Sequence, residues 1–341
     1  MSANDDLVAA CDKKDVKGAA AALAAGASPD ATDPSGMSVL NTACVLKSKA
    51  LAKLLIEAGA NVNATDKNGR AALHWLAEDL AEADLAALCI AKGANVDALD
   101  TEEFSTKSAL HRAVLRPKLD FAEVLLDAGA NIEIADLDDH NTPLMVLCKS
   151  DSGAMSKTEI ANAKWLIERG ANIDAKNDSD ETPLHLAAGS SREMTQFLLA
   201  KGAKITTNKW GMTPLYYCFS TNDKDKALWD LLIAAGCDVN HNGERGTVLH
   251  NAQSHWNPTG VAYLLSKGAD PSLEDADGET PLASAIKLKQ DKIIKLLESA
   301  AKPGAAKKAA PVAKAPPAKA PPAKEPAPKK PAPKAAKAKR R

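Results

Sequence analysis

Short segments with apolar residues at helical spacing recur along most of this chain, and each is closed by a glycine. In residues 50–58, Leu51, Leu54 and Leu55 follow the i, i+3, i+4 spacing that places side chains on one face of an α-helix. Gly59 follows directly, and glycine readily adopts the left-handed conformation that ends a helix. The pattern therefore predicts a short amphipathic helix that stops at Gly59.

The same ending recurs at intervals of 32 to 41 residues, beginning at Gly26, Gly59, Gly93, Gly129, Gly170, Gly202, Gly236 and Gly268. A second phrase precedes each glycine from Gly59 onward, in its fullest form Thr182-Pro-Leu-His185. The threonine hydroxyl can cap a helix, and the proline fits the first helical turn, where no backbone donor is lost. Each repeat thus contains one helix start and one helix stop, which predicts a pair of helices.

These two phrases resemble the ankyrin-repeat family, whose unit of about 33 residues is a β-turn finger followed by two antiparallel helices. The resemblance covers about residues 4–301 and implies an all-α solenoid of about nine helix-turn-helix repeats with β-turn fingers. Residues 5–25 and 278–301 are expected to form its amino and carboxy caps. One repeat cannot bury both helix faces, so stacking of neighbours supplies the core.

Two repeats depart from the common length. Residues 100–107 replace a short Asp-x-x-Gly turn, which predicts a longer, acidic finger. About eight extra residues fall near 149–156, and we expect them to loop out between the two helices of the fifth repeat.

The formal net charge of −1 hides two parts of opposite sign. Residues 302–341 hold 13 Lys or Arg and one acid, a net charge of +12, whereas residues 1–301 hold 30 basic and 43 acidic residues, a net charge of −13. Beyond Lys302 the composition shifts to Lys, Ala and Pro without an aromatic residue. With so little to bury, this part is predicted to be disordered with polyproline character. We therefore expect a repeat domain at 1–301 and a basic tail at 302–341.

The residues that could carry chemistry fit structural roles. His74, His111, His185 and His250 occupy the fourth position of the Thr-Pro-Leu-His phrase. In ankyrin repeats this histidine links neighbouring repeats by hydrogen bonds, so the resemblance implies the same role here. No second ligand recurs at a spacing typical of metal sites, and no phosphate-binding loop or catalytic motif is present. We therefore predict that the protein is not an enzyme and uses no cofactor or metal.

The cysteines and the amino terminus bear on location. The six cysteines are far apart and lack CxxC spacing, which favours a reducing compartment. No apolar run approaches the length of a membrane span, and the amino terminus lacks the apolar core of a signal peptide. We therefore expect a soluble, intracellular protein.

Partner binding is implied by the resemblance on a concave face lined by fingers and first helices. The finger pattern exposes two sets of candidate residues, Lys67, Asn68 and Arg70 on one finger, and Lys209, Trp210 and Met212 on another. Trp210 and Met212 stand out because an apolar pair at a finger tip has no helix beneath it, and tryptophan is enriched at binding hot spots. Packing of Trp210 on the next finger is the alternative.

The tail resembles the Lys/Ala/Pro-rich tails of linker histones, which bind the DNA backbone without sequence preference. Its candidate polyanion-binding residues are Lys329, Lys330, Lys334, Lys337, Lys339, Arg340 and Arg341. These cations could neutralise phosphates, but without an aromatic residue they could not stack on bases. An acidic protein surface or an anionic membrane leaflet would attract the same charge, and a nuclear localisation signal or a solubilising arm are further interpretations.

We therefore predict a monomeric, non-enzymatic scaffold or adaptor in the cytoplasm. Its concave face binds another protein, and its tail tethers the complex to a polyanionic surface such as the cytoskeleton. The alternative is a nuclear, chromatin-associated protein whose tail binds nucleic-acid phosphates. Imaging with and without residues 302–341 separates the two, because nuclear signal that is lost on deletion favours the alternative.

Overall fold

The computed structural model describes residues 2–80, 82–101, 106–149, 157–218 and 226–301. Within these residues the chain forms nine successive helix pairs and no β-strand beyond three isolated bridges. The predicted all-α repeat solenoid of about nine units is confirmed. The predicted tail lies outside the described residues, so the boundary between residues 301 and 302 stays a prediction.

Each repeat contributes a first and a second helix. The first helices are α1 (Ala3–Asp12), α3 (Val39–Val45), α5 (Ala72–Trp75), α7 (Ala109–Ala113), α9 (Pro143–Cys148), α11 (Pro183–Ser190), α13 (Pro214–Tyr217), α15 (Val248–Ser254) and α17 (Pro281–Lys287). The second helices are α2 (Val16–Ala24), α4 (Lys49–Glu57), α6 (Ala83–Ala91), α8 (Asp120–Asp127), α10 (Lys157–Glu168), α12 (Arg192–Ala200), α14 (Lys226–Ala234), α16 (Pro258–Ser266) and α18 (Asp291–Ala301). A π-helical turn, η1 (Leu76–Leu80), continues α5.

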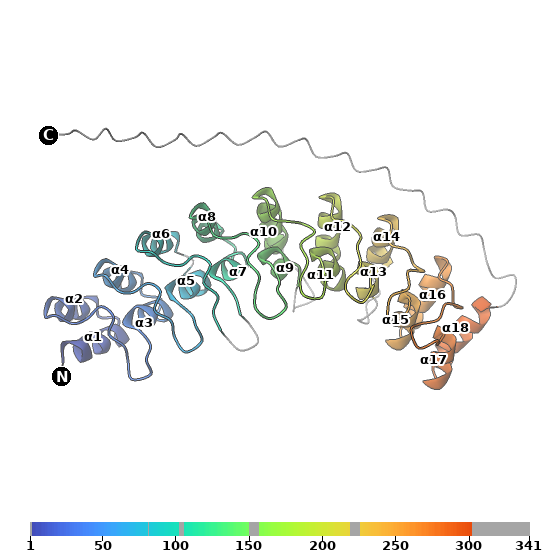
Figure 1. Ribbon diagram of the computed structural model, residues 1–341, viewed down its shortest axis with the longest axis horizontal. Coiled ribbons are helices and arrows are strands. Elements are labelled where there is room, and N and C mark those ends of the chain that lie inside the picture. Colours follow the sequence, from blue (N-terminus) through green and yellow to red (C-terminus); the bar gives the residue numbers. More distant parts are fainter. Residues whose placement is uncertain (1, 81, 102–105, 150–156, 219–225, 302–341) are drawn as a thin grey trace, which may run out of the picture.

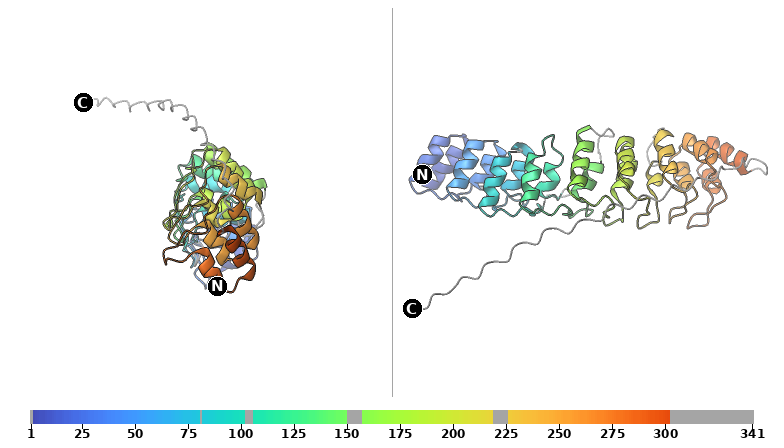
Figure 2. Two further views of the ribbon diagram at one scale, coloured as in Figure 1. Left: turned by 90° about the vertical axis from the view of Figure 1, so that its right-hand side faces the viewer. Right: turned by 90° about the horizontal axis from the view of Figure 1, so that it is seen from above.

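The helix pairs stack side by side into an arc (Figure 1). The first helices form its inner row and the second helices its outer row, and the finger loops extend beyond the inner row. From above, the pairs follow one another in chain order (Figure 2). The inner side of the arc is therefore the concave face, lined by fingers and first helices.

Local sequence sets the helix ends as predicted. Thr142 caps α9 with its side chain at the Met145 N–H, and Pro143 occupies the first turn. Thr280 and Pro281 repeat this arrangement in α17. At the other end of a repeat, Gly59 has φ 93° and ends helix α4. The other seven glycines expected in this role also have positive φ.

A side-chain turn shapes the tip of the finger before α13. In this finger, Asn208 Oδ1 accepts the backbone N–H groups of Trp210 and Met212 at 3.0 and 2.9 Å. Neighbouring fingers are then joined through their backbones, because the Glu244 N–H donates to the Trp210 carbonyl at 2.8 Å. The tip of the finger before α13 is therefore fixed by the finger that follows it.

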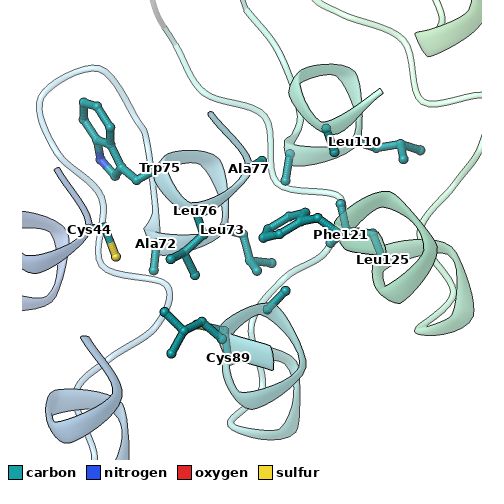
Figure 3. Packing of buried hydrophobic residues seen from close by; sticks show 14 of the residues in the cluster. Cys44, Ala72, Leu73, Trp75, Leu76, Ala77, Cys89, Leu110, Phe121 and Leu125 are labelled. Carbon is teal, nitrogen blue, oxygen red and sulfur yellow. The ribbon is translucent and has the colours of Figure 1, made fainter. Parts of the chain in front are cut away.

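The core crosses repeat boundaries and consists of two clusters, one over residues 7–203 and one that includes Ala188 and residues 215–297. Leu73 of α5, Cys89 of α6 and Phe121 of α8 are buried in one cluster, so side chains of the third and fourth repeats interlock (Figure 3). Trp229 of α14 is fully buried in the second cluster. Burial of this kind is roughly proportional to apolar area removed from water and needs both neighbours of a repeat.

The phrase histidines couple adjacent repeats. His185 Nδ1 lies 3.1 Å from the Thr182 backbone N–H, and its Nε2 lies 3.2 Å from the Met212 carbonyl of the next repeat. Because an N–H only donates and a carbonyl only accepts, the ring must be the neutral tautomer with its proton on Nε2. The other three Nε2 contacts are His74 to Ala98 at 3.0 Å, His111 to Asn141 at 3.0 Å and His250 to Glu279 at 2.9 Å. Their predicted role as links between repeats is confirmed.

The finger at residues 100–107 contains one partner of a buried ion pair. Asp100, expected in an acidic finger, is fully buried, and its carboxylate accepts from the Arg112 guanidinium of α7 and from the Lys107 N–H. Arg112 also donates to Glu78 at 2.7 Å. The base of this finger is thus anchored to α7, while residues 102–105 lie outside the described residues. The extra residues of the fifth repeat fall between α9 and α10, and 150–156 likewise lie outside the described part.

We predict that stability falls between pH 7 and pH 5 because of the phrase histidines. Burial lowers the pKa of His185 to about 4, and it lowers the pKa of His74 and His111. The unfolded chain therefore takes up protons near pH 6.5 before the folded chain does, so stability is complete above that pH and falls as the pH drops towards 4. At pH 5 the free energy of unfolding is lower by about 2 kcal/mol because of His185 alone.

Urea unfolding followed by far-ultraviolet circular dichroism at both pH values measures this loss. Carboxylates of lowered pKa, such as Asp33, lose their contribution only at more acidic pH, so they do not obscure the window. His185→Gln should reduce the pH dependence, whereas His255→Gln, at an exposed position, should leave it unchanged. Equal pH dependence in the parent chain and in both variants would contradict the assignment of the stability loss to the phrase histidines.

Candidate functional site

A groove of about 620 Å³ lies on the concave face over the last four repeats. Fingers supply one side of it and first helices the other. The finger residues are Glu181, Trp210, Met212, Arg245 and Asp275, and the residues from first helices and their ends are Tyr216, Tyr217, His250, Asn251, Gln253, Ser254, His255, Ser284 and Leu288. The groove therefore combines aromatic walls with charged and amide groups, a composition typical of binding sites.

Trp210 stands at the finger side of the groove and is held by its neighbours. Its backbone is fixed by Asn208 and by the Glu244 N–H of the next finger. The Lys209 Nζ lies 4.5 Å from the centroid of the indole ring and the Arg245 guanidinium carbon 5.7 Å from it. Cations at these distances are attracted to an aromatic face. The ring is half-buried, so part of it stays open to the groove.

A polar chain beneath the groove ties three consecutive fingers to α13. The Tyr217 hydroxyl donates to Glu181, and Asn208 Nδ2 donates to the same hydroxyl at 2.8 Å. Asn177 Nδ2 donates to Glu181 at 3.0 Å and to Asn141 at 3.1 Å. Burial, together with the bond to Glu181, raises the pKa of Tyr217, so its hydroxyl stays protonated and can donate. This network fixes the floor of the groove.

Tyr216 stands where other repeats carry the phrase histidine. Its backbone carbonyl accepts from Asn251 Nδ2 at 2.6 Å, which joins α13 to α15. Burial raises the pKa of its hydroxyl. Among the described residues that hydroxyl has no hydrogen-bond partner, and neither does the indole N–H of Trp210. Two donors of the groove wall are therefore available to a ligand.

The structure separates the six predicted partner-binding residues into two places. Lys67 is exposed on the finger before α5, and Asn68 and Arg70 lie half-buried beside it. Arg70 pairs with Asp66 at 3.3 Å and its guanidinium covers the Trp75 ring at 3.7 Å. This finger precedes α5, whereas the groove is lined by residues of α13, α15 and α17 and their fingers, farther along the arc (Figure 1).

On the second finger Lys209 is exposed and Trp210 borders the groove, but the expectation that Met212 lies exposed at the tip is wrong. Met212 is 6% exposed. Its N–H bonds to Asn208 and its carbonyl accepts from His185, so the finger backbone turns this residue inward. The seven tail residues proposed to bind polyanions, Lys329, Lys330, Lys334, Lys337, Lys339, Arg340 and Arg341, lie outside the described residues.

Sequence reasoning missed most of the groove. Tyr216 could have been noticed in the sequence, because it occupies the position where the Thr-Pro-Leu-His phrase usually has a histidine. Arg245 and Leu288 left none, since their place in the groove depends on how neighbouring repeats stack. His241 is half-buried, and its Nε2 lies 2.8 Å from the Gly211 carbonyl of the adjacent finger.

The titratable groups of the described part are not arranged for covalent or metal chemistry. All six cysteines are buried, and burial raises the pKa of Cys11 to about 11 and of Cys89 and Cys237 to about 12. Thiols with such values remain protonated near neutral pH and are poor nucleophiles. No group of three or more His, Cys, Asp or Glu side chains with metal-binding geometry occurs in this part of the chain. Nor does any helix formed by these residues have the length and apolarity needed to cross a membrane.

The chain matches a known protein family. The family model described as ankyrin repeats (3 copies) matches residues 7–100, 152–242 and 220–307, which together make up more than half of the chain.

Similar proteins come from several organisms. The chain is 33% identical over 177 residues to tyrosine-protein kinase Shark of Drosophila melanogaster, which is 50% of this chain and 19% of the kinase. It is 29% identical over 214 residues to ankyrin repeat protein nuc-2 of Neurospora crassa, 62% of this chain and 19% of that protein. It is 30% identical over 219 residues to ankyrin repeat and SOCS box protein 16 of Homo sapiens, 61% of this chain and 46% of that protein. The chain thus spans less than half the length of each relative.

Gly243→Ala should displace the finger that borders the groove. A Cβ at Gly243 would lie 2.8 Å from the carbonyl oxygens of both Trp210 and Gly211, so the backbone would have to move. We expect a loss of about 1–3 kcal/mol in the free energy of unfolding, measured by urea denaturation, and a shifted Trp210 indole signal in NMR spectra.

Gly189→Ala is the matched control. Its Cβ would meet the nearest atom, Tyr217 Cβ, at 3.6 Å, an ordinary contact inside α11. This change should be neutral or stabilising by up to about 1 kcal/mol, since alanine favours helices over glycine. If both variants lost the same stability, close packing of the two fingers would not be the cause.

Proposed function

The chain belongs to the ankyrin-repeat family, and on this basis we propose that it is a non-enzymatic adaptor whose concave face binds a protein partner. Ankyrin repeats generally mediate protein–protein interaction. The groove at Trp210 is the central contact of this proposal. Trp, Tyr and Arg dominate the energetics of protein interfaces, and Trp210, Tyr216 and Arg245 all line the groove.

The unpaired donors of the groove carry the proposal. A ligand that supplies acceptors can bond to donors at a groove wall in place of solvent, so these two donors favour such a ligand. Trp210 offers its indole N–H and Tyr216 its hydroxyl, and both are positioned by bonds to neighbouring elements. The wall is therefore organised before a partner arrives, which reduces the entropy lost on binding.

The absence of a catalytic role is part of the same proposal. The phrase histidines donate hydrogen bonds to carbonyls of the next repeat, and the cysteine thiols stay protonated. One relative is named a tyrosine-protein kinase, but only 19% of that protein is matched. These observations support an interaction role.

Lys67, Asn68 and Arg70 form a second, peripheral contact in this proposal. Arg70 is held against Trp75, and only Lys67 is exposed, so a partner that reaches this finger meets a positive charge more than an apolar surface. Exposed charges chiefly affect association rates and specificity. A partner that spans both places would follow the inner side of the arc.

For the tail we propose a tethering role. Its net charge of +12 suits a polyanionic surface such as the cytoskeleton, in a monomeric protein of the cytoplasm. Such binding would weaken steeply as salt rises. Recovery of the full chain with nuclear chromatin would favour the phosphate-binding alternative.

Trp210→Ala should weaken partner binding about 30-fold at unchanged stability, because a central tryptophan typically contributes about 2 kcal/mol. Trp256→Ala is the matched control, since Trp256 is 58% exposed and lies outside the residues that line the groove. Partners recovered from native cells with the full chain are identified first. Their affinities for the purified parent chain, Trp210→Ala and Trp256→Ala are then compared by calorimetry.

Two results would contradict the proposal. Unchanged affinity in Trp210→Ala would remove the groove from the interface. Equal losses in both tryptophan variants would mean that exposed aromatic side chains, and not this groove, hold the partner.

A further inference from the structure

The groove is rich in hydrogen-bond donors and has an acidic edge. Trp210 and Tyr216 present donors without a partner among the described residues, and the Arg245 guanidinium lies beside them. The last finger, residues 270–279, holds five carboxylates and no Lys or Arg, and its Asp275 lines the groove. A fitting ligand supplies backbone acceptors to the aromatic wall and cations to this finger.

A proline-rich segment with lysines has this chemistry. Proline lacks a backbone N–H, and the polyproline II conformation has no internal hydrogen bonds, so its carbonyls are free to accept. Such segments dock in aromatic-lined grooves at low entropic cost because their conformation is already extended. Lysines spaced along the segment meet acidic groups next to the aromatic wall.

The chain itself continues with such a segment. Residues 310–324 consist of three copies of the pentad Ala-Pro-x-Ala-Lys, within a part of the chain that has a net charge of +12. It follows α18, and α18 packs on α17, whose Ser284 and the adjoining Leu288 line the groove. Charge, composition and point of attachment all fit the groove.

We propose that residues 310–324 dock in this groove within the same molecule and compete there with the protein partner. The inference rests on the proposed function, because it regulates that same site. In a polyproline II conformation Pro316, Lys319 and Pro322 share one edge, since the helix has three residues per turn. The prolines of this edge meet Trp210 and Tyr216, and the lysine between them meets the acidic finger.

The connection from α18 to residues 310–324 is long enough for these residues to reach the groove. A weak contact between them and the groove is sufficient. Eight residues lie between Ala301 and Ala310, and the extended chain between these two residues spans up to about 30 Å. That distance exceeds the length of α17, which is about 10 Å at 1.5 Å per residue. A short tether gives an effective concentration of order millimolar, so even a millimolar intrinsic affinity closes the groove in about half of the molecules.

A spin label in the tail tests the contact in the full chain. All six native cysteines are buried, so Ala318→Cys provides one accessible thiol for the label. The indole N–H signals are observed by NMR, with the Trp210 signal assigned through Trp210→Phe. We expect the label to broaden the Trp210 signal strongly, because a weak contact exchanges quickly and every molecule visits the docked state, while the Trp75 signal, from the third repeat, is unchanged.

Two tail variants of equal charge separate proline docking from simple charge attraction. Replacing Pro316, Pro317, Pro321 and Pro322 by alanine should restore the Trp210 signal and strengthen partner binding about twofold. The matched control replaces Pro326, Pro328, Pro331 and Pro333, and it should behave as the parent chain. A signal that recovers equally in both variants, or in neither, overturns the proposal.

Dilution and partner titration complete the test. An effect that disappears on dilution would mean contact between two copies and would overturn docking within one molecule. An unaffected Trp210 signal together with intact partner binding refutes the docking and leaves the proposed function standing. Tail contact at Trp210 without any effect of Trp210→Ala on partner affinity supports the docking and refutes the groove as the partner site.

Discussion

The hydrogen bond from a histidine Nε2–H to a carbonyl of the next repeat is the interaction on which this stack depends. His185 makes it to Met212 and His250 to Glu279, so a first helix holds the finger that follows it. Those fingers also carry Trp210 and Asp275, which border the groove. One such bond contributes only about 1 kcal/mol net, but leaving its buried partners unpaired costs more. Repeat contacts and groove shape are therefore fixed by the same bonds.

Much of the fold could be predicted from the sequence because its signals are local. A threonine cap with a following proline starts α9 and α17, and a glycine with positive φ stops α4. Both devices act within a single turn of chain. The family resemblance then supplied the stacking, which no single repeat encodes, because its helices bury their faces only against neighbours.

The rest depends on contacts between repeats. Met212 looked like an exposed tip residue, yet the finger backbone and His185 turn it inward. Asp100 looked like part of an acidic finger, yet Arg112 draws it into a fully buried ion pair. Arg245 reaches the groove because one finger lies against another. In each case the deciding partner lies in another element of the stack, beyond the reach of local patterns.

The tautomer of His185 and His250 tests this account most directly. Long-range nitrogen–proton NMR correlations of the side chains identify which ring nitrogen carries the proton. The account predicts the neutral Nε2–H form for both residues at pH 7, with His185 remaining neutral until the pH approaches its pKa of about 4. An Nδ1–H tautomer, or averaging between the two forms, would show that the bond between repeats is not made and would contradict the account.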